Sequence, residues 1–145
     1  MNNFFDKICC NRHELKEYLL HILGVYISGN LDDKTFMIFY GESSNNGKLK
    51  LVNLISFLLG NYYTAGPNGI VIKTKQESSN SHTAHMNMLI GKRLATINEL
   101  DEDDFLSNDN IKTLTGDDKT PLRKLGEEFD LYTLLSHIIL ITNER

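Results

Sequence analysis

Apolar residues along the chain follow two patterns that alternate with polar turns. Between residues 13 and 28 they recur every three or four positions, which predicts an amphipathic helix ending before Gly29. The run from Phe36 to Tyr40 has no polar alternation, as is typical of a strand covered on both faces in a parallel sheet. A second helical pattern over 51–59 follows. The order of helix, strand and helix indicates an α/β fold.

The same alternation continues through the second half of the chain. The predicted elements are a short strand near 62–64, a turn at 66–69, an exposed loop over 73–81, a helix over 83–90, a buried strand over 93–99, a helix over 108–114, a hairpin or irregular projection over 117–132 with a turn near Gly126, and a strand over 137–143. Buried strands separated by helices predict a mostly parallel sheet covered by helices on both faces.

The connection between the first strand and the second helix has the composition of a phosphate-binding loop. It reads Gly41, Glu42, Ser43, Ser44, Asn45, Asn46, Gly47, Lys48, Leu49. Glycines let backbone N–H groups converge on phosphate oxygens, the helix offers its positive end, and a lysine reaches the β- and γ-phosphates. The usual pattern has four residues between the glycines and a Ser or Thr after the lysine, whereas here five intervene and Leu49 follows.

Length and charge limit the classes of function. A chain of 145 residues with 41% hydrophobic and 23% charged residues is expected to fold as one globular unit. The net charge of −4 provides no overall basic field, so nucleic-acid contact requires a local cluster or an assembly of copies. Adjacent Cys9 and Cys10 and the lack of a long apolar run predict a soluble, intracellular protein without membrane contact.

Two polar residues at strand ends are candidates for the chemistry of nucleotide hydrolysis. Glu99 follows one buried strand and Asn143 ends another, and ligands of open α/β sheets gather at such ends. Glu99 could bind Mg²⁺ or orient water, and the Asn143 amide could position the water or contact the γ-phosphate. Taken alone, each is more often an ordinary loop-edge residue. Together with a phosphate-binding loop, they point to one nucleotide site.

Two charged groups outside this site have competing interpretations. The acidic run 101–104 is best interpreted as a solvated loop, because it lacks the glycine and spacing of a calcium loop. Lys119, Arg123 and Lys124 could contact DNA phosphates, although three basic residues in a surface segment more often serve only solvation.

Four blocks of the chain resemble the ATPase core of superfamily 3 helicases, in particular the primase-helicases of large DNA viruses and phages. They are Phe39-Tyr40-Gly41 with Asn46-Gly47-Lys48, the strand 91–99 ending in Glu99, the segment 112–118 with Arg123, and the strand 138–144 containing Asn143. The resemblance spans nearly the whole chain, from about residue 13 to 144.

This resemblance implies an AAA+-like P-loop NTPase core of three layers with a hairpin before the last strand. Residues 1–30 would form a helical segment packed on a core of residues 31–145. ATP and Mg²⁺ are the implied ligands, with Lys48, Glu99 and Asn143 catalytic. Members of the family form rings, usually hexamers, around single-stranded DNA, which would make Lys119, Arg123 and Lys124 pore residues. The family's arginine finger, and a fifth strand that covers the edge of the 36–40 strand, would follow residue 145.

The leading hypothesis is therefore the ATP-binding core of a DNA helicase that acts in viral replication, in the host cytoplasm or at a viral replication site. Because Leu49 replaces a hydroxyl residue and the arginine finger is missing, we expect little or no ATP hydrolysis by the chain alone, and its status as an enzyme stays open. The alternative is a non-catalytic interaction module that associates with full-length helicase subunits. A small nucleotide kinase is a weaker third reading, because it does not explain the 112–118 block.

Overall fold

The computed structural model describes residues 2–30, 35–41, 47–72, 79–98, 100, 104–116, 119–123 and 127–143. Its elements are α1 (Asn2–Ile8), α2 (His13–Ser28), β1 (Phe36–Tyr40), α3 (Lys48–Leu59), η1 (Gly60–Tyr62), β2 (Tyr63–Gly66), η2 (Asn68–Ile70), α4 (Ser79–Asn87), β3 (Leu94–Asn98), α5 (Asn108–Thr115), β4 (Thr120–Leu122), β5 (Asp130–Tyr132) and β6 (His137–Thr142). Among the described residues, no helix is long and apolar enough to cross a membrane.

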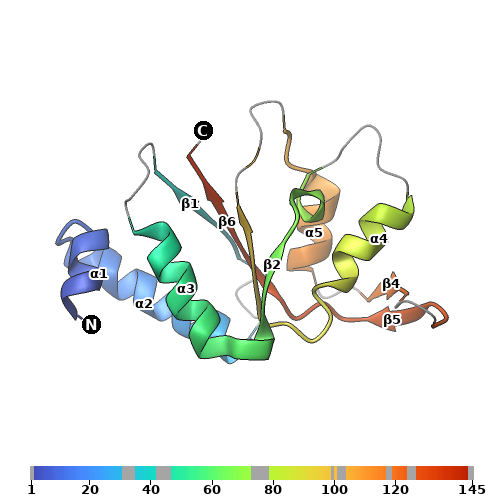
Figure 1. The fold of residues 1–145 in the computed structure, drawn as a ribbon, viewed down its shortest axis with the longest axis horizontal. Helices are drawn as coiled ribbons and strands as arrows, with labels where there is room; N and C mark the ends of the chain where they lie inside the picture. Colours follow the sequence, from blue (N-terminus) through green and yellow to red (C-terminus); the bar gives the residue numbers. More distant parts are fainter. Residues whose placement is uncertain are drawn as a thin grey trace.

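Four parallel strands form the central sheet in the order β1-β6-β3-β2. Figure 1 shows α1, α2 and α3 on one side of this sheet and α4 and α5 on the other. Strands β4 and β5 pair antiparallel in a separate hairpin that precedes β6. The predicted α/β class with a mostly parallel sheet is confirmed, and the segment predicted as a hairpin or irregular projection is a hairpin.

Each face of the sheet has its own hydrophobic core. On one face, residues of α2 and α3 pack on Leu94, Ile139 and Ile141. On the other, Met86 of α4 and Leu114 of α5 pack with strand residues that include Ile97. All six residues of β6 are buried, because this strand lies inside the sheet and faces both cores.

Strand β1 is less covered than its apolar sequence predicts. Ile38 is 49% exposed and Tyr40 is 38% exposed. The reason is topological, because β1 is the terminal strand of the described sheet and pairs there only with β6. The expectation of full cover on both faces is therefore wrong for this strand.

Two other boundaries also differ from the sequence-based expectation. Helix α4 begins at Ser79 and ends at Asn87, so residues 79–81 are helical rather than part of the predicted loop, and residues 88–90 form turns. Residues 73–78, the remainder of that predicted loop, lie outside the described residues, as does Gly126 in the predicted hairpin turn.

A cluster of polar contacts around buried Tyr26 and His137 ties the start of β6 to the end of α2. The rings of Tyr26 and His137 stack with their centroids 4.0 Å apart. His137 Nε2 lies 2.6 Å from the Asn30 carbonyl oxygen, and the Tyr26 hydroxyl lies 2.9 Å from Thr35 Oγ1. These contacts join α2 to the start of β6 and to the residue just before β1.

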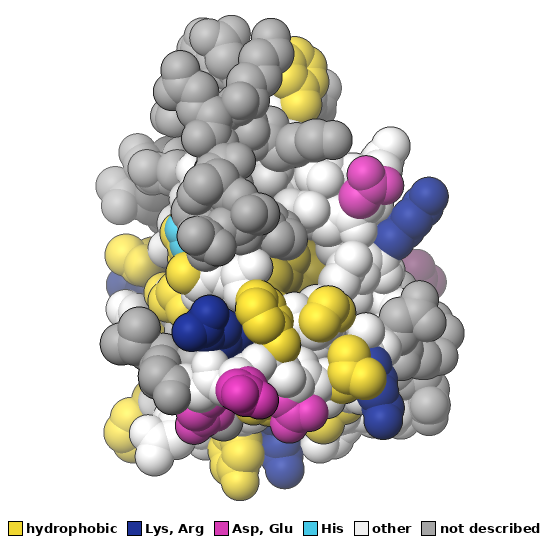
Figure 2. Space-filling view, turned by 90° about the vertical axis from the view of Figure 1, so that its right-hand side faces the viewer, with side chains coloured by type: hydrophobic (Ala, Val, Ile, Leu, Met, Phe, Trp, Pro, Cys, Tyr) yellow, Lys and Arg dark blue, Asp and Glu magenta, His cyan; other side chains and the backbone are white. Residues whose placement is uncertain are grey.

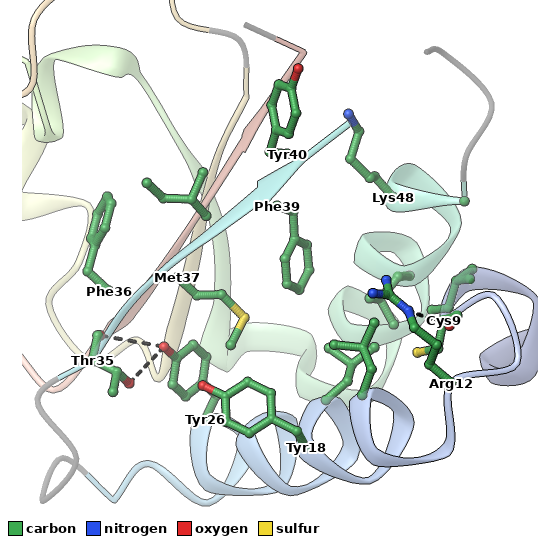
Figure 3. A pocket seen from close by; sticks show the side chains of 16 residues that line it. Cys9, Arg12, Tyr18, Tyr26, Thr35, Phe36, Met37, Phe39, Tyr40 and Lys48 are labelled. Carbon is green, nitrogen blue, oxygen red and sulfur yellow. Dashed lines mark hydrogen bonds between the residues drawn. The ribbon is translucent and has the colours of Figure 1, made fainter. Parts of the chain in front are cut away.

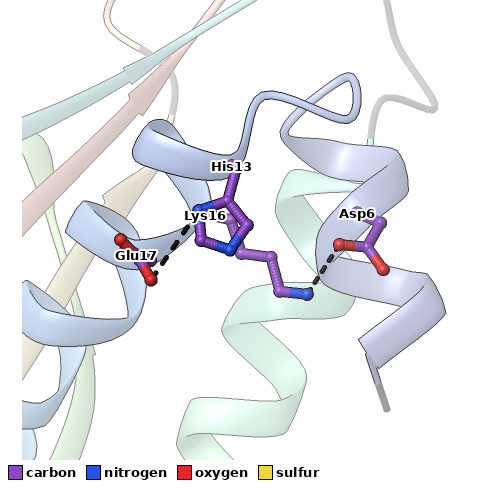
Figure 4. A network of polar contacts seen from close by, with 4 residues as sticks. All are labelled: Asp6, His13, Lys16 and Glu17. Carbon is purple, nitrogen blue, oxygen red and sulfur yellow. Dashed lines mark hydrogen bonds and ion pairs between the residues drawn. The ribbon is translucent and has the colours of Figure 1, made fainter.

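Helices α1 and α2 form a short hairpin at the N-terminus. The chain reverses at Cys10 and Asn11, both with positive φ (52° and 57°). An ion pair links the two helices, with Lys16 Nζ 2.6 Å from Asp6 Oδ1 (Figure 4). This pairing holds α1 against α2, beside the first turn of α3 (Figure 1).

Candidate functional site

The parallel sheet brings the ends of three strands to one edge. Tyr40, the last residue of β1, is in register with Thr142 of β6, and Asn98 of β3 is in register with Ile141. Residues that follow these strands therefore gather at the carboxyl edge of the sheet, where α/β proteins commonly bind ligands. Gly41 and Asn143 lie there. Glu99, which follows Asn98, lies outside the described residues.

Contacts from the ends of β1 and β6 meet at Lys48 on this edge. It is the first residue of α3, after Gly47 with a φ of 89°. Its ammonium nitrogen lies 3.0 Å from the Gly41 carbonyl oxygen, 3.0 Å from the Thr142 carbonyl oxygen and 2.5 Å from Asn143 Oδ1. The structure thus brings together Gly41, Lys48 and Asn143, three of the residues predicted for the site.

The Thr142 carbonyl is a member of this cluster that sequence reasoning missed. It accepts hydrogen bonds both from Lys48 and from the Gly41 backbone N–H, the latter at 3.3 Å. No side-chain pattern identifies a main-chain acceptor, so only the pairing of β1 with β6 could reveal it.

Of the other residues in the predicted loop, the structure describes Gly47 and Leu49 at its C-terminal end. Glu42, Ser43, Ser44, Asn45 and Asn46 lie outside the described residues. Leu49 is 66% exposed and presents an apolar side chain where the usual pattern places a hydroxyl. It offers no oxygen ligand to a cation. Among the described residues, no group of three or more His, Cys, Asp or Glu side chains could hold a metal ion.

A cavity of about 640 Å³ adjoins the lysine along the outer edge of β1. It runs between β1 and the α1–α2 hairpin, with Gly47 and Lys48 among its lining residues (Figure 3). Arg12, in the connection between α1 and α2, also lines it, and its Nε lies 3.5 Å from the Cys9 carbonyl oxygen. No motif in the sequence pointed to Arg12.

Two of the three residues predicted to contact DNA, Lys119 and Arg123, flank β4 of the β4–β5 hairpin. Lys119 is exposed. Arg123 Nε donates to the Glu127 carbonyl oxygen at 2.9 Å, and its guanidinium carbon lies 5.8 Å from the Phe129 ring centroid. Lys124 lies outside the described residues.

The surface around the hairpin is mixed in charge rather than uniformly basic. Figure 2 shows acidic, basic and hydrophobic side chains interspersed on the face that contains the hairpin. Arg123 itself contacts Glu127 and Phe129 within the hairpin segment. A role for Lys119, Arg123 and Lys124 in DNA contact stays a prediction.

Comparison with known proteins agrees with this architecture. The sequence is 31% identical over 129 residues to L207/L206, a protein of Acanthamoeba polyphaga mimivirus provisionally named a helicase. The match covers 88% of this chain and 13% of the mimivirus protein. No family model matches the sequence.

The fold is similar to two apo A-form structures of the C-terminal region of NrS-1. One, of residues 305–718, has a TM-score of 0.65 at 14% identity over 98% of this chain and 31% of that chain. The other has a TM-score of 0.67 at 14% identity over 97% of this chain and 32% of that chain. The chain is therefore related in sequence to one segment of a viral protein provisionally named a helicase, and it shares its fold with part of the NrS-1 C-terminal region.

Proposed function

We propose that this chain is the ATP-binding core of a superfamily 3 type DNA helicase. The observation that carries the proposal is the position of Lys48, whose ammonium group lies at the carboxyl edge of the parallel sheet with Gly41 and Asn143. A cation at the start of a helix and beside these strand ends suits a bound triphosphate. The sequence relation to the mimivirus protein and the shared fold support this assignment.

The roles within the site follow from its chemistry. Backbone N–H groups of residues 41–47 would surround the phosphates, and Lys48 would contact the β- and γ-phosphates. Glu99 would bind Mg²⁺ or orient water, and Asn143 would contact the γ-phosphate or the attacking water. Mg²⁺, when bound, would neutralise charge on the phosphates. The described residues fit the phosphates better than the metal, because Leu49 supplies no oxygen ligand.

In an assembled ring, the β4–β5 hairpin would face single-stranded DNA. Lys119, Arg123 and Lys124 would then contact phosphates of the strand. The partners would be further copies of the chain, as a hexamer, or subunits of a full-length helicase, working in the host cytoplasm or at a site of viral replication. Because each isolated copy lacks an arginine finger from a neighbour, we expect it to hydrolyse ATP very weakly or not at all.

Calorimetric titration with ATP tests the proposal. Wild-type chain should bind ATP, and Lys48→Ala should weaken binding at least about tenfold, the effect of losing one charge-assisted contact. Lys50→Ala is the matched control, because Lys50 is exposed two residues further along α3. The proposal fails if millimolar ATP does not bind to the wild-type chain, or if both variants bind it equally well.

The metal site has its own test at Leu49. Leu49→Ser should raise ATP affinity in the presence of Mg²⁺ and leave it unchanged with EDTA, because only the metal uses the new hydroxyl. An equal gain in both conditions would show that the substitution acts on the fold instead. No gain in either would show that the loop departs from a nucleotide site at more than this position.

A second candidate function is association with a full-length helicase without catalysis. The position of β1 favours it, because among the described residues this strand is terminal in the sheet and pairs with β6 alone, and the edges of terminal strands recruit additional strands. The occupant would be an extended segment of a longer helicase polypeptide, since this chain matches only 13% of the mimivirus protein. Co-purification with that full-length protein tests this candidate. Capture by wild-type chain and loss of capture in Ile38→Lys would support it, and no capture by wild-type chain would exclude it for that partner.

A further inference from the structure

The Lys48 ammonium group has three N–H donors, and the oxygen atoms within hydrogen-bonding distance of it include three from the ends of β1 and β6. Two are main-chain carbonyls, of Gly41 after β1 and Thr142 at the end of β6, each at 3.0 Å. The third is the side-chain oxygen of Asn143 at 2.5 Å, the shortest of the three. The lysine is thus held by the ends of two neighbouring strands.

These three acceptors differ in how easily they can be withdrawn. Thr142 pairs with Tyr40 of β1, and its carbonyl also accepts the N–H of Gly41, the residue after β1, so both carbonyl acceptors belong to main chain at the ends of the paired strands. Asn143 follows the last residue of β6 and is exposed, so its side chain can rotate about its own bonds without disturbing the sheet. Asn143 is therefore the adjustable member of the set.

The neutral side-chain amide of Asn143 suits a contact that must be exchanged for another. An amide oxygen is neutral, so its hydrogen bond to an ammonium group is weaker than that of a carboxylate. A phosphate carries full negative charge and attracts the same ammonium more strongly. A carboxylate at position 143 would instead compete with the phosphate for Lys48.

We propose that Asn143 is a positioning residue that holds the Lys48 ammonium against the ends of β1 and β6 while the nucleotide site is empty, and gives it up to an incoming phosphate. The holding contact of this inference rests on the three distances to Lys48. The release step rests on the proposed function. Asn143 then acts before any contact with a γ-phosphate, by fixing the position of the Lys48 ammonium group.

Lysine acylation of the nucleotide-free chain tests the holding contact directly. With limiting acetic anhydride and peptide mass spectrometry, Lys48 should react on the order of tenfold more slowly than exposed Lys50, because its hydrogen bonds must break before the amine reacts. In Asn143→Ala the Lys48 rate should rise severalfold toward that of Lys50. In Asn143→Asp, which keeps an oxygen acceptor, Lys48 should stay protected.

Asn53→Ala is the matched control, because Asn53 is an exposed asparagine on α3, the helix that begins with Lys48. It should leave the Lys48 to Lys50 ratio unchanged. Urea unfolding of each variant separates a local change at Lys48 from general destabilisation, which would raise the reactivity of other protected lysines as well. If Lys48 reacts as fast as Lys50 in wild type, or if Asn143→Ala leaves its protection intact, the inference is overturned.

Binding of inorganic triphosphate without Mg²⁺ tests the release step. Asn143→Asp should weaken this binding about tenfold or more, because the carboxylate retains the lysine and repels the anion. Unchanged affinity in Asn143→Asp would overturn the release step. If acylation shows the protected lysine but wild type binds neither triphosphate nor ATP, the holding contact stands and the proposed function fails, so the two failures are distinguishable.

Discussion

Replacement of Gly47 by alanine perturbs the fold beside the candidate site. Gly47 has a φ of +89°, and a Cβ added there would lie 2.7 Å from Ile8 Cγ2, which projects from α1. The left-handed backbone costs an alanine about 1–2 kcal/mol. Forcing a methyl group into a filled space adds about 1–3 kcal/mol. We therefore expect Gly47→Ala to lower the free energy of unfolding by about 2–5 kcal/mol, the sum of these two costs.

Gly91→Ala separates the two costs. Gly91 has a similar φ of +73°, but no atom of the described residues lies within 4 Å of a Cβ built there. Gly91→Ala should therefore lower the free energy of unfolding only by the backbone cost of about 1–2 kcal/mol. Urea unfolding followed by circular dichroism measures both variants.

A double-mutant cycle then assigns the excess cost to Ile8. In the Ile8→Ala background, Gly47→Ala should cost about as much as Gly91→Ala, because the methyl group that it meets is gone. If Gly47→Ala is no more destabilising than Gly91→Ala in the wild-type background, α1 does not press on the start of α3 and the reasoning is refuted.

Three further predictions concern the cysteines, the helical hairpin and a buried hydroxyl. Burial raises the pKa of the Cys9 thiol, so less of it is thiolate at a given pH. Iodoacetamide at pH 8 should therefore modify exposed Cys10 first, and faster labelling of Cys9 would contradict its burial. Asp6→Asn should lower the free energy of unfolding by only about 0.5 kcal/mol, because the ion pair with Lys16 is partly solvated, and a loss above about 2 kcal/mol in urea unfolding would contradict this. Ser136 is 1% exposed and its hydroxyl lies 2.8 Å and 3.1 Å from two main-chain carbonyls, so Ser136→Ala should cost about 1–2 kcal/mol in the same assay, and an unchanged midpoint would refute that.

Much of the secondary structure was predictable because its signals are local. The 3.6-residue repeat and the following glycine predict a helix at residues 13–28, the bounds observed for α2. The uninterrupted apolar run near the C-terminus becomes β6, whose six residues are all buried. Helix α4 was harder to delimit, because residues 79–81 are polar and carry no apolar repeat.

The candidate site was predictable in part. The sequence singled out Gly41, Lys48 and Asn143 by residue type and by their position beside apolar runs, and the structure brings these three together. It could not show that Lys48 and Asn143 are in contact, because 95 positions separate them and only the pairing of β1 with β6 brings them close. No sequence motif marked Arg12 as a site residue, since its place in the cavity depends on how the α1–α2 hairpin packs.

From residue 13 onward the sequence by itself determined the type and order of most elements, because periodicity and glycine punctuation act over a few residues. Only the tertiary structure decided which strands are neighbours. That choice leaves Ile38 and Tyr40 exposed at the terminal strand of the described sheet, although their run reads as a fully buried strand. It also places the Lys48 ammonium between the ends of β1 and β6. Strand order is set by the packing of two cores against the whole sheet, which no local pattern encodes.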